Sequence, residues 1–316
     1  MAAWGLLVLA GAVALGAAMV PVGPGWLAGA GAVAVSAAYA WALAARTGGR
    51  PVVFGALALA MGVAVLVSDD VRLRTGAAVL TCVASAVLGV MATVPARRFR
   101  HAAREVAVAL VIAAVGALAT VGFAPAIALT RFEYSTLGLA FLGAFGLVYR
   151  LGAGLHGLGR RGVLAVLVGG VLLALTLAYA ELLRRYGSPG VVTGLIDGVH
   201  WSRGHLGAFP RPIETVLGVP ALAWGCHMRA RRRQGWWVCA FGVAATTPVA
   251  QALLDPRIGL LESGLSVAYG AAVGLAIGYL LIRVDLRVTG PRGRRARRAE
   301  EAAAGRPEPA RTRALL

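Results

Sequence analysis

Apolar residues in this chain come in long runs separated by short polar stretches. A helix rises about 1.5 Å per residue, so roughly twenty apolar residues span the ~30 Å hydrocarbon layer of a bilayer. The runs have about this length, and the pattern therefore predicts ten transmembrane helices. These cover residues 3–20, 25–45, 51–67, 75–94, 105–129, 134–149, 162–183, 213–228, 235–254 and 259–282.

The composition agrees with a protein that lies almost entirely in a membrane. Hydrophobic residues make up 59% of the chain and charged residues only 14%, whereas a soluble domain has about 25% charged residues. We expect an all-α integral membrane protein, a polytopic bundle formed by residues 1–286 that includes an outer loop at 184–212. Residues 287–316 combine Pro, Gly and mixed charge, which predicts a disordered, Arg-rich tail.

The distribution of arginine predicts the orientation in the membrane. All 31 basic residues are Arg, and 23 of them fall on alternate connections and the tail, against 8 on the opposite connections. Because positive charge is retained in the cytoplasm, both termini are predicted to be cytoplasmic. The net charge of +18 then favours anionic lipids of the inner leaflet as partners. Nucleic acid is not an expected partner, since basic and aromatic residues are not interleaved.

The residue types and motifs that are absent from the sequence indicate where the protein is located and whether it binds a cofactor. It contains no Lys and no Asn, and both have AT-rich codons, so we expect a bacterial plasma membrane protein from a GC-rich genome. No basic residue precedes the first apolar run, because the first Arg is Arg46, which favours a retained helix over a cleaved signal peptide. Cys82, Cys226 and Cys239 lack the paired spacing of metal or redox motifs, so no metal or other cofactor is predicted.

The outer loop holds the first candidate site. Ser188 and Pro189 are typical of a helix start, and apolar residues at helical spacing after them predict a short amphipathic helix on the outer membrane surface. Its polar residues could bind a metal, act as an acid–base pair, bind an anion or headgroup, or simply face water. The candidates are Asp197, His200, Arg203, His205 and Glu214, with Arg211 as a further anion-binding group.

The second candidate site lies where the ninth and tenth predicted helices meet at the outer side. Thr247, Gln251 and Asp255 are four residues apart, so they share a helical face. Glu262 begins a row of small residues in the next helix that includes Gly270, Gly274 and Gly278, a spacing typical of close helix packing. We expect Glu262 to lean toward the bundle as a substrate or ion site. The alternatives are solvation by headgroups or an ion pair with Arg257.

Transport is the predicted function. Ten helices with both ends inside divide into two halves of five with opposite orientation, as in many secondary transporters. The prediction is a transporter or permease with a polar site at its extracytoplasmic face for a small-molecule or lipid-linked substrate. The alternatives are an enzyme acting on a lipid-linked substrate at the outer leaflet and a non-catalytic envelope assembly protein. An enzyme is less favoured, because no HExxH, GxSxG or phosphate loop is present.

Overall fold

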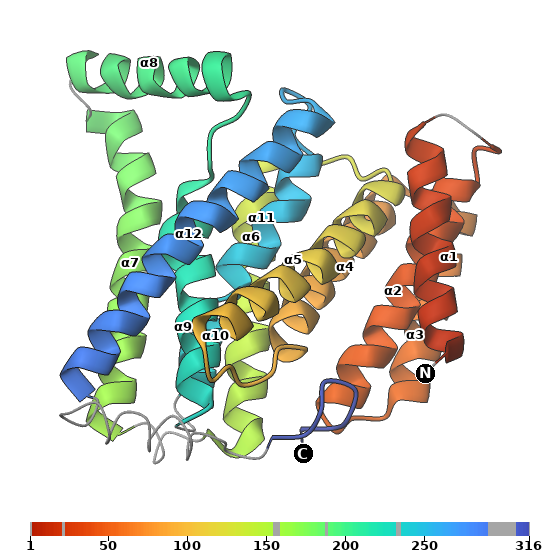
Figure 1. Ribbon diagram of the computed structural model, residues 1–316. Helices are drawn as coiled ribbons and strands as arrows, with labels where there is room; N and C mark the ends of the chain where they lie inside the picture. Colours follow the sequence, from red (N-terminus) through yellow and green to blue (C-terminus); the bar gives the residue numbers. More distant parts are fainter. Residues whose placement is uncertain are drawn as a thin grey trace.

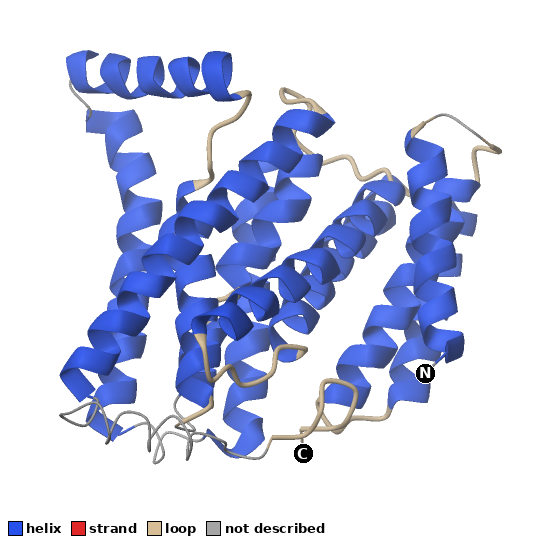
Figure 2. Ribbon diagram, viewed as in Figure 1, coloured by secondary structure: helices blue, strands red, loops and turns tan. Residues whose placement is uncertain are grey.

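The computed structural model describes residues 2–20, 23–153, 159–186, 189–231, 235–289 and 308–315. These residues form helices and turns without a single strand among them (Figure 2). The helices are α1 (Ala2–Met19), α2 (Leu27–Arg46), α3 (Pro51–Ser68), α4 (Val71–Met91), α5 (Phe99–Gly122), α6 (Leu129–Val148), η1 (Tyr149–Ala153), α7 (Gly159–Tyr186), α8 (Pro189–Leu206), η3 (Glu214–Gly218), α9 (Val219–Arg229), α10 (Gly235–Ala240), α11 (Val243–Leu253) and α12 (Leu260–Thr289).

The helices run alternately up and down, and both chain termini lie at the same end of the bundle (Figure 1). We call this end the termini side and the opposite end the α8 side, because α8 lies across it, nearly perpendicular to α7 (Figure 1). The helix that was expected in the outer loop is therefore confirmed. It is a full 18-residue helix rather than a short one.

Seven helical segments of the described chain are long and apolar enough to cross a membrane. They are Leu27–Arg46, Pro51–Ser68, Val71–Met91, Phe99–Gly122, Leu129–Leu151, Gly235–Leu253 and Leu260–Val288. Trp4–Met19 and Val166–Tyr179 are shorter apolar helices. These apolar helices agree with the prediction of a helical, multi-pass membrane bundle.

Local signals explain where several helices begin. Pro51 opens α3, where its missing N–H would have had no helical partner. Asp70 caps α4, and its side chain accepts hydrogen bonds from the backbone N–H groups of Arg72 and Leu73. The sharp turn before α4 is made by Asp69, whose φ of 52° lies in the left-handed region.

The largest core cluster is made by the middle helices together with helices of the later part of the chain. It combines buried residues of α4, α5, α6, α9, α10 and α11. Phe141, Phe145, Trp237 and Phe241 pack there, with ring centroids 5.2 to 5.9 Å apart. By contrast, α3 keeps most of its apolar side chains on the outer surface, as expected for a helix that faces lipid.

Residues 308–315, which we call the C-terminal segment, pack against the termini side of the bundle (Figure 1). The sequence suggested disorder for the tail from residue 287, of which residues 290–307 and 316 lie outside the described residues. Among the described residues of this range, α12 continues to Thr289, and the C-terminal segment makes specific polar contacts. Its polar groups find buried arginines and a buried carboxylate, which composition alone does not reveal.

Candidate functional site

The candidate site is built around a wide helical turn, η3, at the start of a helix that proline interrupts. In η3 the backbone N–H of Val219 donates to the carbonyl of Glu214, five residues earlier. Pro220 explains this geometry, since its ring has no N–H for a regular bond and clashes with the carbonyl four residues before it. Such π-type turns often occur at functional sites. Here the turn places Glu214 at the first position.

Glycines of α12 form the surface on which this turn packs. A Cβ added to Gly270 would lie 2.8 Å from Cδ of Glu214, and one added to Gly274 would lie 2.7 Å from Cβ of Val219. Gly278 approaches Ala223 and Pro220 in the same way. The close-packing role predicted for this row of small residues is thus confirmed. The elements that pack on the row are η3 and α9.

The Glu214 carboxyl group is the most unusual feature of the site. Its residue is 0% exposed, and neither carboxyl oxygen has a hydrogen-bond partner among the described residues. A buried carboxylate without partners costs several kcal/mol or more in free energy. The neutral acid is therefore the form that fits the closed packing between η3 and α12.

Polar groups of α6, of α11 and of the loop before η3 lie together on the α8 side. Arg211, one turn before Glu214, makes an ion pair of 3.5 Å with Glu133 of α6. Gln251 of α11 donates to the Glu133 carbonyl at 3.3 Å and to Thr136 Oγ1 at 3.2 Å. Sequence reasoning missed Glu133 and Thr136, because nothing in the spacing of α6 relates them to residues that lie more than a hundred positions later.

A second broken helix lies against the first. The helical path from Gly235 to Leu253 is interrupted between α10 and α11, and Pro248 sits inside α11. Pro248 has no N–H for the carbonyl of Ala244. Gly218 fits tightly against that backbone, because a Cβ there would lie 2.1 Å from N of Ala245 and 2.7 Å from the Ala244 oxygen. The two breaks therefore contact each other directly.

The second candidate site predicted from the sequence does not converge in the structure. Glu262 makes an ion pair of 3.0 Å with Arg203 of α8, rather than with Arg257. Asp255 instead binds Arg257, with Nε–Oδ1 and Nη2–Oδ2 distances of 2.8 and 2.9 Å, and this hydrogen bonding lowers the pKa of Asp255. The reason is local, since the short turn after α11 brings Arg257 back onto Asp255 two residues away.

The hydroxyl groups of Thr247 and of two serines in α12 have hydrogen-bond acceptors within the helix bundle. The hydroxyl of Thr247 is fully buried and donates to the carbonyl of Val243 in its own helix at 2.8 Å. Ser266 donates to the Phe209 carbonyl and Ser263 to the Ala252 carbonyl, so both fasten α12 to its neighbours. Of the predicted group, Gln251 hydrogen-bonds to the polar groups of α6, while Asp255 and Arg257 lie close enough to Arg211 and Glu133 for electrostatic attraction.

The polar residues of the outer loop lie on α8 and are exposed. Asp197, His200 and His205 all face outward, and His205 donates from Nδ1 to the Trp201 carbonyl at 2.9 Å. The described residues contain no group of three or more His, Cys, Asp or Glu side chains that could hold a metal ion. The structure therefore does not bring Asp197 and the histidines together with Glu214.

An apolar cavity lies elsewhere, between α2, α3 and α4. Its volume is about 470 Å³. Its lining is apolar except for Arg72 and for Ser36 and Thr81, whose hydroxyl groups bond to each other at 2.9 Å. A cavity of this kind lacks the polar groups that would orient a polar substrate.

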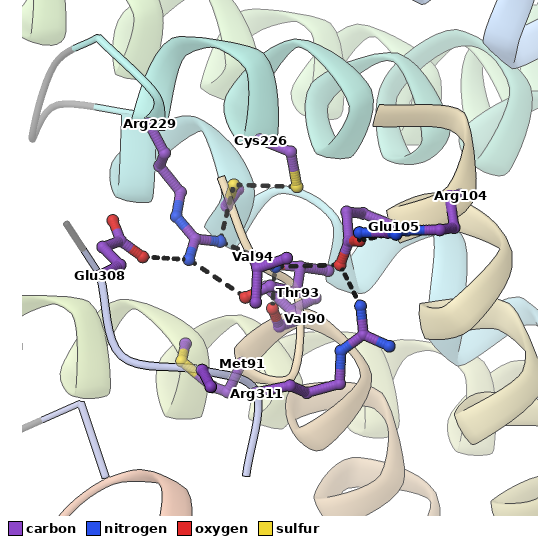
Figure 3. Close-up of polar contacts among 12 residues, drawn as sticks. Val90, Met91, Thr93, Val94, Arg104, Glu105, Cys226, Arg229, Glu308 and Arg311 are labelled. Carbon is purple, nitrogen blue, oxygen red and sulfur yellow. Dashed lines mark hydrogen bonds and ion pairs between the residues drawn. The ribbon is translucent and has the colours of Figure 1, made fainter. Parts of the chain in front are cut away.

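A second set of buried charges lies on the termini side (Figure 3). The Arg229 side chain at the end of α9 has 0% exposure and binds Glu308 of the C-terminal segment at 2.5 Å. Glu105 of α5 is also fully buried and binds Arg104 at 3.0 Å and Arg311 at 2.6 Å. Sequence reasoning assigned these arginines to topology only, because arginines next to a helix end are the usual signal for orientation.

No protein-family model, curated protein or solved structure matches this chain in sequence or fold comparisons.

Proposed function

We propose that the protein is a proton-coupled membrane transporter in which Glu214 binds and releases the coupling proton. The observation that supports this proposal is the complete burial of the Glu214 carboxyl group without a hydrogen-bond partner in the described structure. Ionisable residues inside helical membrane proteins commonly mark ion pathways and proton relays. The adjoining breaks in η3–α9 and in α10–α11 support the same function, since transporter sites are typically formed by discontinuous helices.

The packing suggests how one proton could be coupled to movement. With η3 closed on Gly270, the carboxyl group is fully buried and has no hydrogen-bond partner in the described structure, and this burial favours the neutral form. Separation of η3 from α12 would admit water and stabilise the carboxylate. Protonation and closure are then linked, which is the property that a proton-driven transporter requires.

The proposed topology has ten passes with both termini in the cytoplasm of a bacterium. The seven long apolar helices, α1, α7 and η3–α9 together would supply these passes. The α8 side would then be extracytoplasmic, and α8 would lie on the membrane surface. Its exposed apolar side chains support this position, because Ile196, Trp201 and Leu206 have no place in the bundle core. Anionic lipids at the termini side remain the expected lipid partners.

Reconstituted vesicles provide the test of function. Wild-type protein is placed in vesicles that contain a pH-sensitive dye, and a panel of amino acids, sugars and organic cations is added under a pH gradient. We expect at least one compound to cause proton movement with the wild type. Glu214→Gln should abolish this movement, because the amide cannot exchange a proton.

Glu262→Gln is the matched control, since Glu262 lies on the same side but is partly exposed and paired with Arg203. This variant should keep proton movement at half the wild-type rate or more. Retained proton coupling in Glu214→Gln would contradict the proposal. Loss of coupling in Glu262→Gln alone would move the site to Glu262, as the sequence had suggested.

A further inference from the structure

The guanidinium group of Arg229 sits in a pocket whose walls come mainly from the bundle. Nη1 donates to Thr93 Oγ1 at 2.7 Å, and Nη2 donates to the Thr93 carbonyl at 3.1 Å. The ring of Trp236 lies against the guanidinium carbon at 3.4 Å. These contacts orient the cation and exclude water from it, but none of them supplies negative charge.

The negative charge comes from the far end of the chain. Glu308 is the carboxylate that binds Arg229 in the described part of the chain, and its side chain is only 10% exposed. Figure 3 shows this carboxylate reaching Arg229 from the C-terminal segment, outside the helices that build the pocket. An acidic side chain thus occupies a cationic pocket in the manner of a ligand.

A second buried arginine holds the same segment without a carboxylate. Arg46 is 3% exposed, and its Nη1 donates to the carbonyls of Ala310 and Arg313 at 2.8 and 2.7 Å. It also shares the Thr93 carbonyl with Arg229, from Nη2 at 3.4 Å. Two buried guanidinium groups therefore meet near one carbonyl and one carboxylate, which leaves local positive charge in excess.

The C-terminal segment is held by these polar contacts and by the ion pair of 2.6 Å between Arg311 and Glu105. Ala310, Thr312 and Arg313 are exposed. Leu315 is partly buried against the core, and its backbone N–H donates to the Arg46 carbonyl at 2.8 Å. Release of the segment would remove the charge of Glu308 and leave Arg229 and Arg46 facing an open pocket. A free guanidinium in such a pocket recruits an oxyanion.

We propose that Arg229, Thr93 and Arg46 form a binding site for a carboxylate-bearing anion, and that Glu308 occupies this site as an internal ligand. An external anion and the C-terminal segment then compete for the same pocket. Binding of the anion therefore controls whether the C-terminal segment covers the termini side of the bundle. This inference concerns the opposite side of the bundle from Glu214 and does not rest on proton coupling.

The first experiment asks whether a free carboxylate replaces Glu308. The melting temperature of full-length Glu308→Ala is measured in detergent with acetate or with chloride at equal ionic strength. Acetate should raise it by about 3 °C more than chloride does at an acetate concentration tenfold above its dissociation constant. The Arg229→Gln/Glu308→Ala double variant should show no difference between the two salts. Glu308→Gln, which keeps the side-chain shape, takes the place of Glu308→Ala if the latter does not fold.

The second experiment asks whether the anion displaces the segment. Leu315→Cys is labelled with a maleimide in a protein that retains Glu308, while the native cysteines Cys82, Cys226 and Cys239 are all buried. Acetate should increase the labelling rate several-fold relative to chloride, and Arg229→Gln should remove this difference. Equal melting temperatures of Glu308→Ala in the two salts would overturn the proposal. Equal labelling rates in the two salts would also overturn it, since the pair would then be only a structural contact.

Discussion

Each end of the broken helix formed by η3 and α9 carries a buried ionisable residue, and the two residues differ in the polar partners around them. Glu214 begins η3 and Arg229 ends α9, and both residues are 0% exposed. Arg229 has a carboxylate, a hydroxyl, a carbonyl and an aromatic ring around its guanidinium group. The Glu214 carboxyl group has no hydrogen-bond partner in the described structure.

This difference indicates which residue can change its charge. A buried ion with fitted partners is held in its charged form, and removal of either partner is strongly destabilising. A buried acid without partners is more stable when neutral, and it gains a charge only when its surroundings open. The comparison therefore supports the proposed docking contact at Arg229 and the proposed proton exchange at Glu214.

The largest expected effect is that of removing Arg229. Arg229→Leu should lower the free energy of unfolding by about 3–5 kcal/mol, because it leaves Glu308 buried without its cation. The measurement is the midpoint of thermal or denaturant unfolding in detergent. Glu214→Leu is the matched change at the other end of the helix, and it should be neutral or stabilising. Equal destabilisation by both changes would contradict the distinction between the two sites.

A smaller effect is expected at the contact between Glu214 and α12. Gly270→Ala places a methyl group only 2.8 Å from Cδ of Glu214, which is closer than normal van der Waals contact. We expect a loss of about 1–3 kcal/mol in unfolding free energy, as for other overpacked contacts, together with impaired proton coupling. Gly264→Ala in the same helix is the control, because a Cβ there meets nothing within 4 Å. Similar stability of the two variants would show that η3 does not pack on Gly270.

How much of this could be predicted depends on the kind of contact. The helical membrane class and the Gly seam of α12 follow from hydropathy and from a local spacing of four residues. Gln251 lies among polar groups on the α8 side, but its partners Glu133 and Thr136 come from α6. The packing of Glu214 on Gly270 and the pairing of Arg229 with Glu308 join residues far apart in the chain. No local pattern encodes such contacts.

The smallest expected effect concerns the ion pair between Asp255 and Arg257, the arginine that was an alternative partner for Glu262. Arg257 lowers the pKa of Asp255 below its usual 3.8, so the stabilisation is complete above that pH and is lost as the pH falls through the folded-state pKa. Because the Arg257 side chain is 74% exposed, Arg257→Ala should cost only about 0.5 kcal/mol at pH 7. The unfolding midpoints of the two proteins should differ at pH 7 and begin to converge as the pH falls below 3.8. A difference that persists at the acidic end would point to lost packing instead of lost charge.

The central claim is that Glu214 is neutral in the closed protein at pH 7, and infrared spectroscopy tests it directly. The carbonyl stretch of a protonated carboxyl group is separate from the bands of carboxylates and amides. The difference spectrum of wild type minus Glu214→Gln should contain one such band at pH 7, and wild type minus Glu262→Gln should not, because Glu262 is ion-paired with Arg203. Absence of the band from the Glu214 difference spectrum would contradict the account, since the acid would then be ionised and paired.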